Sequence, residues 1–263
     1  MIKLRNFGWL LRVGILSSLI LPPVIATAQQ PLLETIVGIQ KADKMGKSIA
    51  RADVDGDGFM DIIAGAPEGD VYKPTKNGYD DGYVAVFSGD DFEALAVYVG
   101  PNEDARLGTS IDRVGDLNGD GTEEIIIGAP GVEKNGTDSG AVYVVSIEPW
   151  QYLYQIYGEK QGDNLGHAVA GMGDLNDDGV PDFAYSAPGS DDAMINAGSV
   201  YVISGADGSL IRKFNGTSID DQMGSSLRGI RDLDGDNRLE LAVGSHLWDG
   251  ASKNVGNVSF YNV

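Results

Sequence analysis

Cysteine is absent from this chain, and histidine occurs only twice. Without cysteine the fold forms no disulfide, and the chain has no thiol to which a lipid could be attached. Its stability must therefore come from a packed core and from bound metal. Two histidines also leave few side chains that could act as a base near neutral pH.

Basic residues are scarce relative to acidic ones. The chain has 19 Lys and Arg residues against 39 Asp and Glu residues, which gives a formal net charge of −20 at pH 7. Nucleic acid and anionic membrane surfaces would be repelled by such a field. The composition therefore predicts that neither is a partner.

No apolar run reaches the roughly 20 residues that a membrane-spanning helix needs. Residues 13–25 come nearest, but Pro22 and Pro23 interrupt them. Three basic residues precede this run, and Ala26-Thr27-Ala28 follows it, as in a secretory signal peptide with a small-residue cleavage site. We predict a signal peptide over residues 1–28, cleaved near Ala28, and a secreted, periplasmic or cell-surface location. A membrane anchor is the alternative.

An acidic loop, first seen as Asp53-Val-Asp-Gly-Asp-Gly-Phe-Met-Asp61, occurs four times. Each copy has oxygen-bearing side chains at loop positions 1, 3, 5 and 9, and position 6 is Gly or Asn, the residues that best tolerate a positive φ. Such a loop, with a backbone carbonyl at position 7, can supply the six to eight oxygens that Ca²⁺ prefers. One copy could be a solvated turn, but four copies in the same register indicate cation sites.

The loop differs from an EF-hand after position 9. Position 12 is Ala64, Ile127, Tyr185 or Val243, and none of these can replace the bidentate Glu of that motif. A short apolar run such as Ile125-Ile-Ile-Gly-Ala-Pro130, rich in β-branched residues and closed by Gly and Pro, follows instead of a helix, and this is typical of a buried strand.

The repeats are the length of propeller blades. The first Asp of the loop recurs after 63, 58 and 58 residues. Each repeat contains four strand-like segments, one of which alternates strictly, as in Gly82-Tyr-Val-Ala-Val-Phe87. We predict an all-β fold, a propeller after a signal peptide, spanning residues 29–263. Its four-stranded blades are expected over residues 46–100, 108–158, 166–216 and 224–263.

The start of the propeller resembles the end of a repeat. Leu33 and Ile36 precede Gly38 with the spacing seen before Gly100, and the distance from Gly38 to the next turn glycine is also conserved between repeats. We therefore predict that residues 32–38 complete the last blade and close a four-bladed ring, which removes an exposed strand edge. A dimer in which this strand is swapped is the alternative to a monomer.

The turn glycines, the acidic loops and the Gly-Ala-Pro endings at residues 65–67 and 128–130 resemble FG-GAP repeats, the blades of the integrin α-chain amino-terminal propeller and of similar exported bacterial proteins. The third and fourth endings depart from that pattern, as Ser186-Ala-Pro and Gly244-Ser-His. The resemblance implies Ca²⁺ in the loops on one face of the propeller and partner binding on the opposite face.

Up to four Ca²⁺ ions are expected, and the resemblance identifies their ligands by position. The side chains are Asp53, Asp55, Asp57 and Asp61; Asp116, Asn118, Asp120 and Glu124; Asp174, Asn176, Asp178 and Asp182; and Asp232, Asp234, Asp236 and Glu240, and the backbone carbonyls are those of Phe59, Thr122, Val180 and Arg238. The first and fourth loops carry four carboxylates and the others three, so we expect the first and fourth to bind more tightly.

Residues for catalysis are few. His167 and His246 occupy different places in their repeats, with no nucleophile adjacent in sequence, and the paired carboxylates are assigned to metal. We therefore predict no enzymatic activity. A secreted hydrolase, of the phospholipase or glycosidase kind, is the alternative.

The loops between second and third strands vary in length and content. Residues 69–81 include Tyr72 and Tyr79, residues 132–139 and 190–196 are polar, and residues 247–253 include Trp248. Variable loops with aromatic side chains above a rigid ring are typical of a contact surface. We predict a protein or glycan ligand there, and a calcium-binding interaction or cell-adhesion module.

Overall fold

The computed structural model describes residues 34–40, 42–70, 80–250 and 253–263. The predicted signal peptide lies outside the described residues, as do Tyr72 and Tyr79 of the first variable loop.

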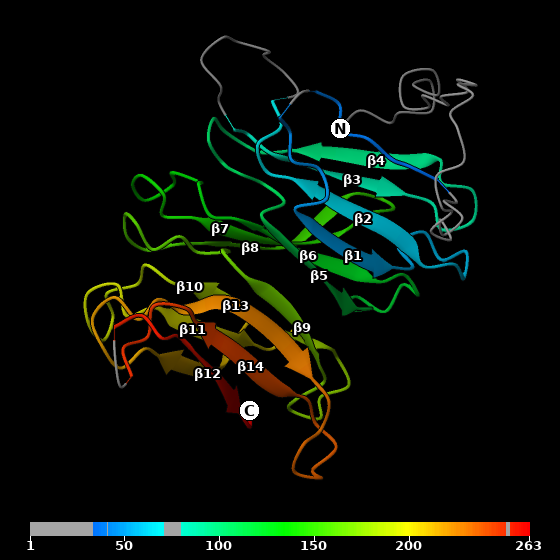
Figure 1. Ribbon diagram of the computed structural model, residues 1–263. Coiled ribbons are helices and arrows are strands. Elements are labelled where there is room, and N and C mark those ends of the chain that lie inside the picture. Colours follow the sequence, from blue (N-terminus) through cyan, green and yellow to red (C-terminus); the bar gives the residue numbers. More distant parts are fainter. Residues whose placement is uncertain (1–33, 41, 71–79, 251–252) are drawn as a thin grey trace, which may run out of the picture.

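The described chain is built from antiparallel β-sheets that follow one another in sequence, as the colours of Figure 1 show. The first sheet contains β1 (Ser48–Ala52), β2 (Asp61–Ala66), β3 (Tyr83–Phe87) and β4 (Ala94–Val99). The second contains β5 (Ser110–Gly115), β6 (Glu124–Ala129), β7 (Ala141–Ser146) and β8 (Gln151–Tyr157). The third contains β9 (Val169–Gly173), β10 (Asp182–Ala187), β11 (Ser199–Ile203) and β12 (Leu210–Asn215). The fourth contains β13 (Met223–Ile230), β14 (Glu240–Ser245) and β15 (Asn257–Tyr261).

Strand order equals sequence order in every sheet, which is the arrangement of a propeller blade. This confirms the predicted all-β propeller fold. The alternating segments form the third strands, and residues paired across two strands share a face, as do Ile63 and Val86 of β2 and β3. Each sheet therefore has two apolar faces. We call the face that packs on the following sheet the forward face, and the other the back face.

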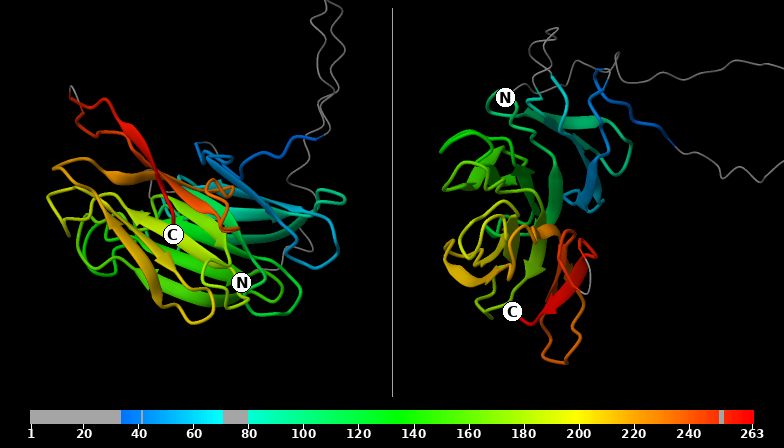
Figure 2. Two further views of the ribbon diagram at one scale, coloured as in Figure 1. Left: turned by 90° about the horizontal axis from the view of Figure 1, so that it is seen from below. Right: turned by 60° about the vertical axis from the view of Figure 1, so that its left-hand side comes forward.

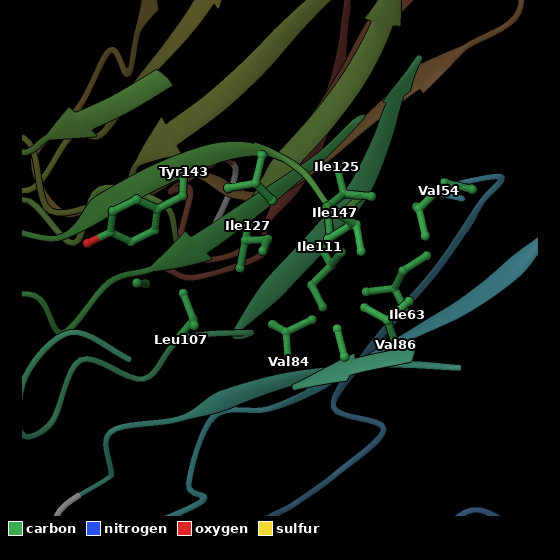
Figure 3. Packing of buried hydrophobic residues seen from close by; sticks show 14 of the residues in the cluster. Val54, Ile63, Val84, Val86, Leu107, Ile111, Ile125, Ile127, Tyr143 and Ile147 are labelled. Carbon is green, nitrogen blue, oxygen red and sulfur yellow. The ribbon is translucent and has the colours of Figure 1, made fainter. Parts of the chain in front are cut away.

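The core lies between consecutive sheets and not within one central layer. Figure 3 shows the first of these layers, where Ile63 and Val84 of the first sheet meet Ile125 and Ile127 of the second. Two similar apolar layers join the second sheet to the third and the third to the fourth. Each layer removes large aliphatic side chains from water, which is the main source of stability in such a fold.

The four sheets form an open arc, with the first and the fourth at its two ends (Figure 2). The first strands line the inside of the arc: β1 contacts β5, β5 contacts β9, and β9 contacts β13. Within the described residues β1 and β13 make no comparable contact. The closed four-bladed ring expected from the sequence is therefore not what this chain forms by itself.

The predicted closing strand also lies elsewhere. The fourth sheet has three strands in the described residues, and residues 34–38 form no strand. Ile36 packs instead on the back face of the first sheet, and the amide of Ile39 donates a 3.0 Å hydrogen bond to the hydroxyl of Tyr83. The prediction that this segment completes the last blade is thus wrong for the isolated chain, because the nearer first sheet offers it an apolar face.

Candidate metal centres

The four acidic loops join the first strand of each sheet to the second. Because the strands are antiparallel, the turns between third and fourth strands lie at the same end. In the first sheet the amide of Gly89, in such a turn, donates a 3.0 Å hydrogen bond to Asp61. Gly205 donates likewise to Asp182 in the third sheet. All four candidate centres therefore share one end of the propeller.

Each loop is shaped by the carboxylate at its first position. Asp53 accepts hydrogen bonds of 2.9 and 3.0 Å from the amides of Gly56 and Gly58. Position 6 has a positive φ, 89° at Gly58 and 67° at Asn237, which confirms the reason expected for Gly and Asn there. The remaining first-position residues, Asp116, Asp174 and Asp232, accept from the equivalent amide of position 6.

Positions 3 and 5 continue the same pattern of hydrogen bonds. The side chain at position 3 accepts from the amide of position 5, and position 5 accepts from the amide of position 7. The position-3 acceptors are Asp55, Asn118, Asn176 and Asp234, and the position-5 acceptors are Asp57, Asp120, Asp178 and Asp236. The position-7 donors are Phe59, Thr122, Val180 and Arg238, whose carbonyls are the predicted backbone ligands. Every predicted ligand residue thus lies in a loop of the same conformation.

The carboxylate at position 9 is buried in all four loops. Asp61, Glu124, Asp182 and Glu240 each begin a second strand and accept a hydrogen bond from the amide of loop position 2, over 2.6 to 2.9 Å. Burial raises the pKa of Glu124 to about 7, and the charges of Asp120 and Asp116 add to the effect. Burial also raises the pKa of Asp61 and of Asp182. These buried charges are unfavourable without a neighbouring cation.

Two loops bring their carboxylates together. In the fourth loop Asp232, Asp234, Asp236 and Glu240 place one oxygen each within 4.8 Å of one another, and Asp53, Asp55 and Asp61 do so in the first. Asp57 of the first loop stands outside that group. Converging carboxylate oxygens are the donors that a hard divalent cation prefers, so these two sets fit such a cation.

The second and third loops have Asn at position 3, and its amide group has local partners. Asn118 Nδ2 donates to Asp120 over 2.9 Å and to Glu124 over 3.0 Å. Asn176 Nδ2 donates to Ser204 over 3.4 Å. In the second loop the side-chain NH₂ group of Asn118, which carries partial positive charge, thus lies between two carboxylates. The side chains that converge in the first and fourth loops are carboxylates only.

Neighbouring loops are tied to one another, a feature that the repeat pattern did not predict. Glu123 of the second loop accepts a 3.1 Å hydrogen bond from the amide of Asp53, and its own amide donates to the Asp53 carbonyl over 2.8 Å. Arg238 of the fourth loop pairs with Asp177 of the third. Glu123, Asp177 and Arg238 occupy variable positions of the repeat, so the repeat pattern gave no sign of these contacts.

The opposite end carries the variable loops and the turns that enter each new sheet. Asp192 of the third variable loop accepts hydrogen bonds from Lys160, Lys213 and Tyr201 over 3.0, 2.6 and 3.1 Å. His167 follows the entry turn at Gly166 and His246 follows the end of β14, so both histidines lie at this end. Trp248 closes its own loop, because its carbonyl accepts from Gly256 over 3.1 Å.

These features define a propeller segment with a row of candidate cation loops at one end. A model of the FG-GAP repeat matches residues 45–87 and 108–145. Integrin alpha pat-2 of Caenorhabditis elegans is 32% identical over 227 residues, which covers 77% of this chain and 18% of that protein. Integrin alpha-5 of Xenopus laevis is 29% identical over 217 residues, with coverages of 76% and 20%. The chain contains FG-GAP repeats and is similar to integrin α chains, and it spans about a fifth of the length of these relatives.

Two solved structures match part of this chain at low sequence identity. The Dos1 propeller has a TM-score of 0.45 at 13% identity and matches 80% of this chain and 46% of its own. Rhamnogalacturonan lyase YesW has a TM-score of 0.45 at 13% identity, with coverages of 74% and 40%. Among the described residues, no helix is long and apolar enough to cross a membrane.

Proposed function

We propose that this protein is an exported calcium-binding propeller that acts as an interaction or cell-adhesion module and not as an enzyme. Residues 1–28 serve as a signal peptide, and the four acidic loops bind up to four Ca²⁺ ions through the side chains and position-7 carbonyls described above. The ligand is a protein or a glycan. This proposal is in keeping with the similarity to integrin α chains, whose whole length is several times greater.

The observation that carries the proposal is the shared construction of the four loops. Four loops with different sequences keep the same backbone hydrogen bonds and the same buried carboxylate at position 9. A loop needed only as a turn requires no buried charge, since an uncompensated carboxylate is costly. Cation binding supplies the missing compensation.

The opposite end of the propeller supports a binding role. Its loops are those that differ between repeats, and they are held on sheets whose strands pack in continuous apolar layers. Rigid strands with variable loops suit recognition, because the scaffold tolerates change at the loops. The network of Asp192 with two lysines and a tyrosine shows that one of these loops is itself well fixed.

The test combines metal analysis with ligand screening. Purified protein should retain Ca²⁺ by elemental analysis, and chelation should lower its melting temperature and its resistance to protease. Arrays of glycans and of extracellular proteins should give signals that mutation of the variable loops removes, with the acidic-loop variant Asp234→Asn as a control for metal effects. Turnover of phosphodiester or glycoside substrates above buffer would favour the hydrolase instead. Indifference to chelator together with an absence of bound metal would refute the calcium sites.

A further inference from the structure

The two ends of the arc expose apolar side chains at positions that are buried between sheets elsewhere. On β15, the last strand of the fourth sheet, Val258 is 63% exposed and Phe260 is 61% exposed. The alternating pattern aligns them with Val84 and Val86 of β3, which are both fully buried against the second sheet. Their counterparts on the second and third sheets, Val142, Val144, Val200 and Val202, are also fully buried. The forward face of the fourth sheet thus has no following sheet.

The other end shows the complementary exposure. Ile49 of β1 lies on the back face of the first sheet and is 67% exposed. Its counterparts in the second and third sheets, Ile111 and Val169, are 8% and 6% exposed, because each packs on the preceding sheet. Met45 is likewise half-buried, whereas its counterpart Leu107 is buried. The first sheet therefore lacks a preceding sheet along its inner strand.

The turn that enters the first sheet has the same backbone conformation as the later turns, which pack on a preceding sheet. In the second and fourth sheets this turn has three positive φ values and ends at a glycine, as at Gly108. The φ values are 59°, 54° and 86° at Asp104, Arg106 and Gly108; 62°, 50° and 89° at Asp220, Gln222 and Gly224; and 74°, 55° and 87° at Ala42, Lys44 and Gly46. The third turn has Gly162, Asn164 and Gly166 at 83°, 54° and 85°.

The later turns each dock on the preceding sheet. The amide of Leu107 donates a 3.1 Å hydrogen bond to the carbonyl of Asp81, and Met223 donates over 2.9 Å to Ala197. By the same alignment, Met45 would donate to the carbonyl of Val255, at the start of the last strand. Neither group has a backbone partner of this kind among the described residues.

We call the places where consecutive sheets meet the seams. The glycines at these positions show the same missing contact. A Cβ on Gly108 would stand 3.0 Å from Gly65 of the preceding sheet, and one on Gly166 would stand 3.0 Å from Gly128. A Cβ on Gly46 would meet no described atom within 4 Å. Gly244 occupies the place of Gly65 and Gly128 in the fourth sheet, and the atoms nearest to a Cβ there belong to Ser225 and Ser226 of its own sheet. Gly46 and Gly244 thus each lack the neighbouring-sheet contact that the equivalent glycines make.

We propose that two copies of this chain join head to tail, so that the back face of the first sheet of each packs on the forward face of the fourth sheet of the other. The contact repeats the interface that already joins consecutive sheets three times within one chain. With four sheets from each copy the ring has eight blades, at the upper end of the usual propeller range of about four to eight. Two equal head-to-tail contacts close it about a twofold axis.

The second copy also completes the fourth sheet. In later repeats the residues before the entry turn form the fourth strand of the preceding sheet, as β4 and β8 do. Residues 34–38 of the second copy would therefore reach the outer edge of β15, which has no partner strand in the described chain. Ring formation exchanges the contact of this segment with Tyr83 for a strand pairing. It also places the Gly46 carbonyl beside the hydroxyl of Ser226, as the Gly108 carbonyl lies beside the hydroxyl of Ser48.

Analytical ultracentrifugation of the purified chain over a dilution series, with calcium present and absent, tests this assembly. The wild-type chain should sediment as a dimer. Phe260→Asp at the tail and Ile49→Asp at the head should each weaken the dimer by about 30-fold or more, because a buried anchor carries much of an interface's affinity. Leu210→Asp, at an apolar residue on β12 that is 54% exposed, should leave the dimer intact.

Mixing the two variants separates this contact from any symmetrical one. The Phe260→Asp chain keeps an unchanged back face on its first sheet, and the Ile49→Asp chain keeps an unchanged forward face on its fourth sheet. An equimolar mixture should therefore form a dimer through the one contact that joins these two faces, although neither variant does so alone. Recovery on mixing also shows that both variants are folded. A wild-type monomer at every concentration, a dimer that survives either substitution, no recovery on mixing, or assemblies larger than two would each overturn the proposal. None of these outcomes depends on the ligand proposed above.

Discussion

The hydroxyl of Ser48 donates a 2.6 Å hydrogen bond to the carbonyl oxygen of Gly108, across the seam between the first and second sheets. Ser110 and Gly166 repeat this bond over 2.9 Å at the next seam. In each case a serine on a first strand meets the glycine that opens the following sheet. Consecutive sheets are thus held by a fixed polar contact on the inner side of the arc as well as by the apolar layers.

The close approach at these seams predicts a strong effect of a single methyl group. A Cβ on Gly128 would overlap the carbonyl oxygen of Gly166. Gly128→Ala should therefore lower the free energy of unfolding by about 2 kcal/mol, since overpacked sites cost about 1–3 kcal/mol. Denaturant titration measures the change. Gly244→Ala, made in the Phe260→Asp background to keep the chain monomeric, is the matched control, because its Cβ meets the Ser226 side chain and no atom of another sheet. Equal losses would contradict the seam argument.

Carboxylate count should set the order of calcium affinities. Asp55→Asn removes one converging oxygen charge from the first loop, and Asn118→Asp adds one to the second. We expect the first change to weaken, and the second to strengthen, binding at its own loop by about tenfold, since charge count tunes such sites over several decades. Calorimetric titration of both variants beside the wild type measures this. Unchanged affinity at the tightest site of Asp55→Asn would argue against ranking the loops by charge.

The buried position-9 carboxylate should have opposite effects on stability with and without bound metal. Glu124 is fully buried and lies near Asp116 and Asp120, so its charge is unfavourable in the cation-free loop. Glu124→Gln should therefore raise the melting temperature in chelator and reduce the gain on adding Ca²⁺. Thermal melts with and without Ca²⁺ measure both effects. A variant less stable than the wild type in chelator would show that the carboxylate is needed for its hydrogen bond to Leu117 and not for a cation.

The sequence predicted those features that depend on neighbouring residues alone. Loop positions, strands and the reason for Gly58 follow from local spacing and backbone preference, and the structure agrees. The path of residues 34–38 could not be predicted in this way. Their strand-like spacing is compatible both with pairing on β15 and with packing on the nearer face around Tyr83. The curvature of the arc likewise depends on side-chain volumes between sheets, so the pairing of Asp53 with Glu123 was visible only in the structure.

Calcium should stabilise the whole propeller by mass action. If a site binds with a dissociation constant of about 10⁻⁴ M, as extracellular modules do, about 10 mM Ca²⁺ adds about 2.7 kcal/mol at that site. The carboxylates of the first and fourth loops belong to the two ends of the arc, so protection should extend to both terminal sheets. Hydrogen exchange with and without Ca²⁺ locates the effect. Protection confined to the loops, with no change in β2 or β14, would contradict a stabilising role.

The Asp192 network predicts an acid-sensitive contribution at the opposite end. Hydrogen bonds from Lys213 and then Lys160 hold the pKa of Asp192 well below its ordinary value. A carboxyl with a depressed folded-state pKa stabilises the fold above its unfolded pKa of about 3.9, and this contribution is lost as the pH falls through the lower folded value. The groups are partly exposed, so the contribution at neutral pH is about 1 kcal/mol. Asp192→Asn should therefore destabilise the chain at pH 7 but match the wild type more closely at each step below pH 4, in denaturant titrations without calcium. Asp90→Asn, at an exposed carboxyl with no ion pair in the described chain, is the control. A difference in unfolding free energy between wild type and Asp192→Asn that stayed constant with pH would show that the network acts through packing and not through charge.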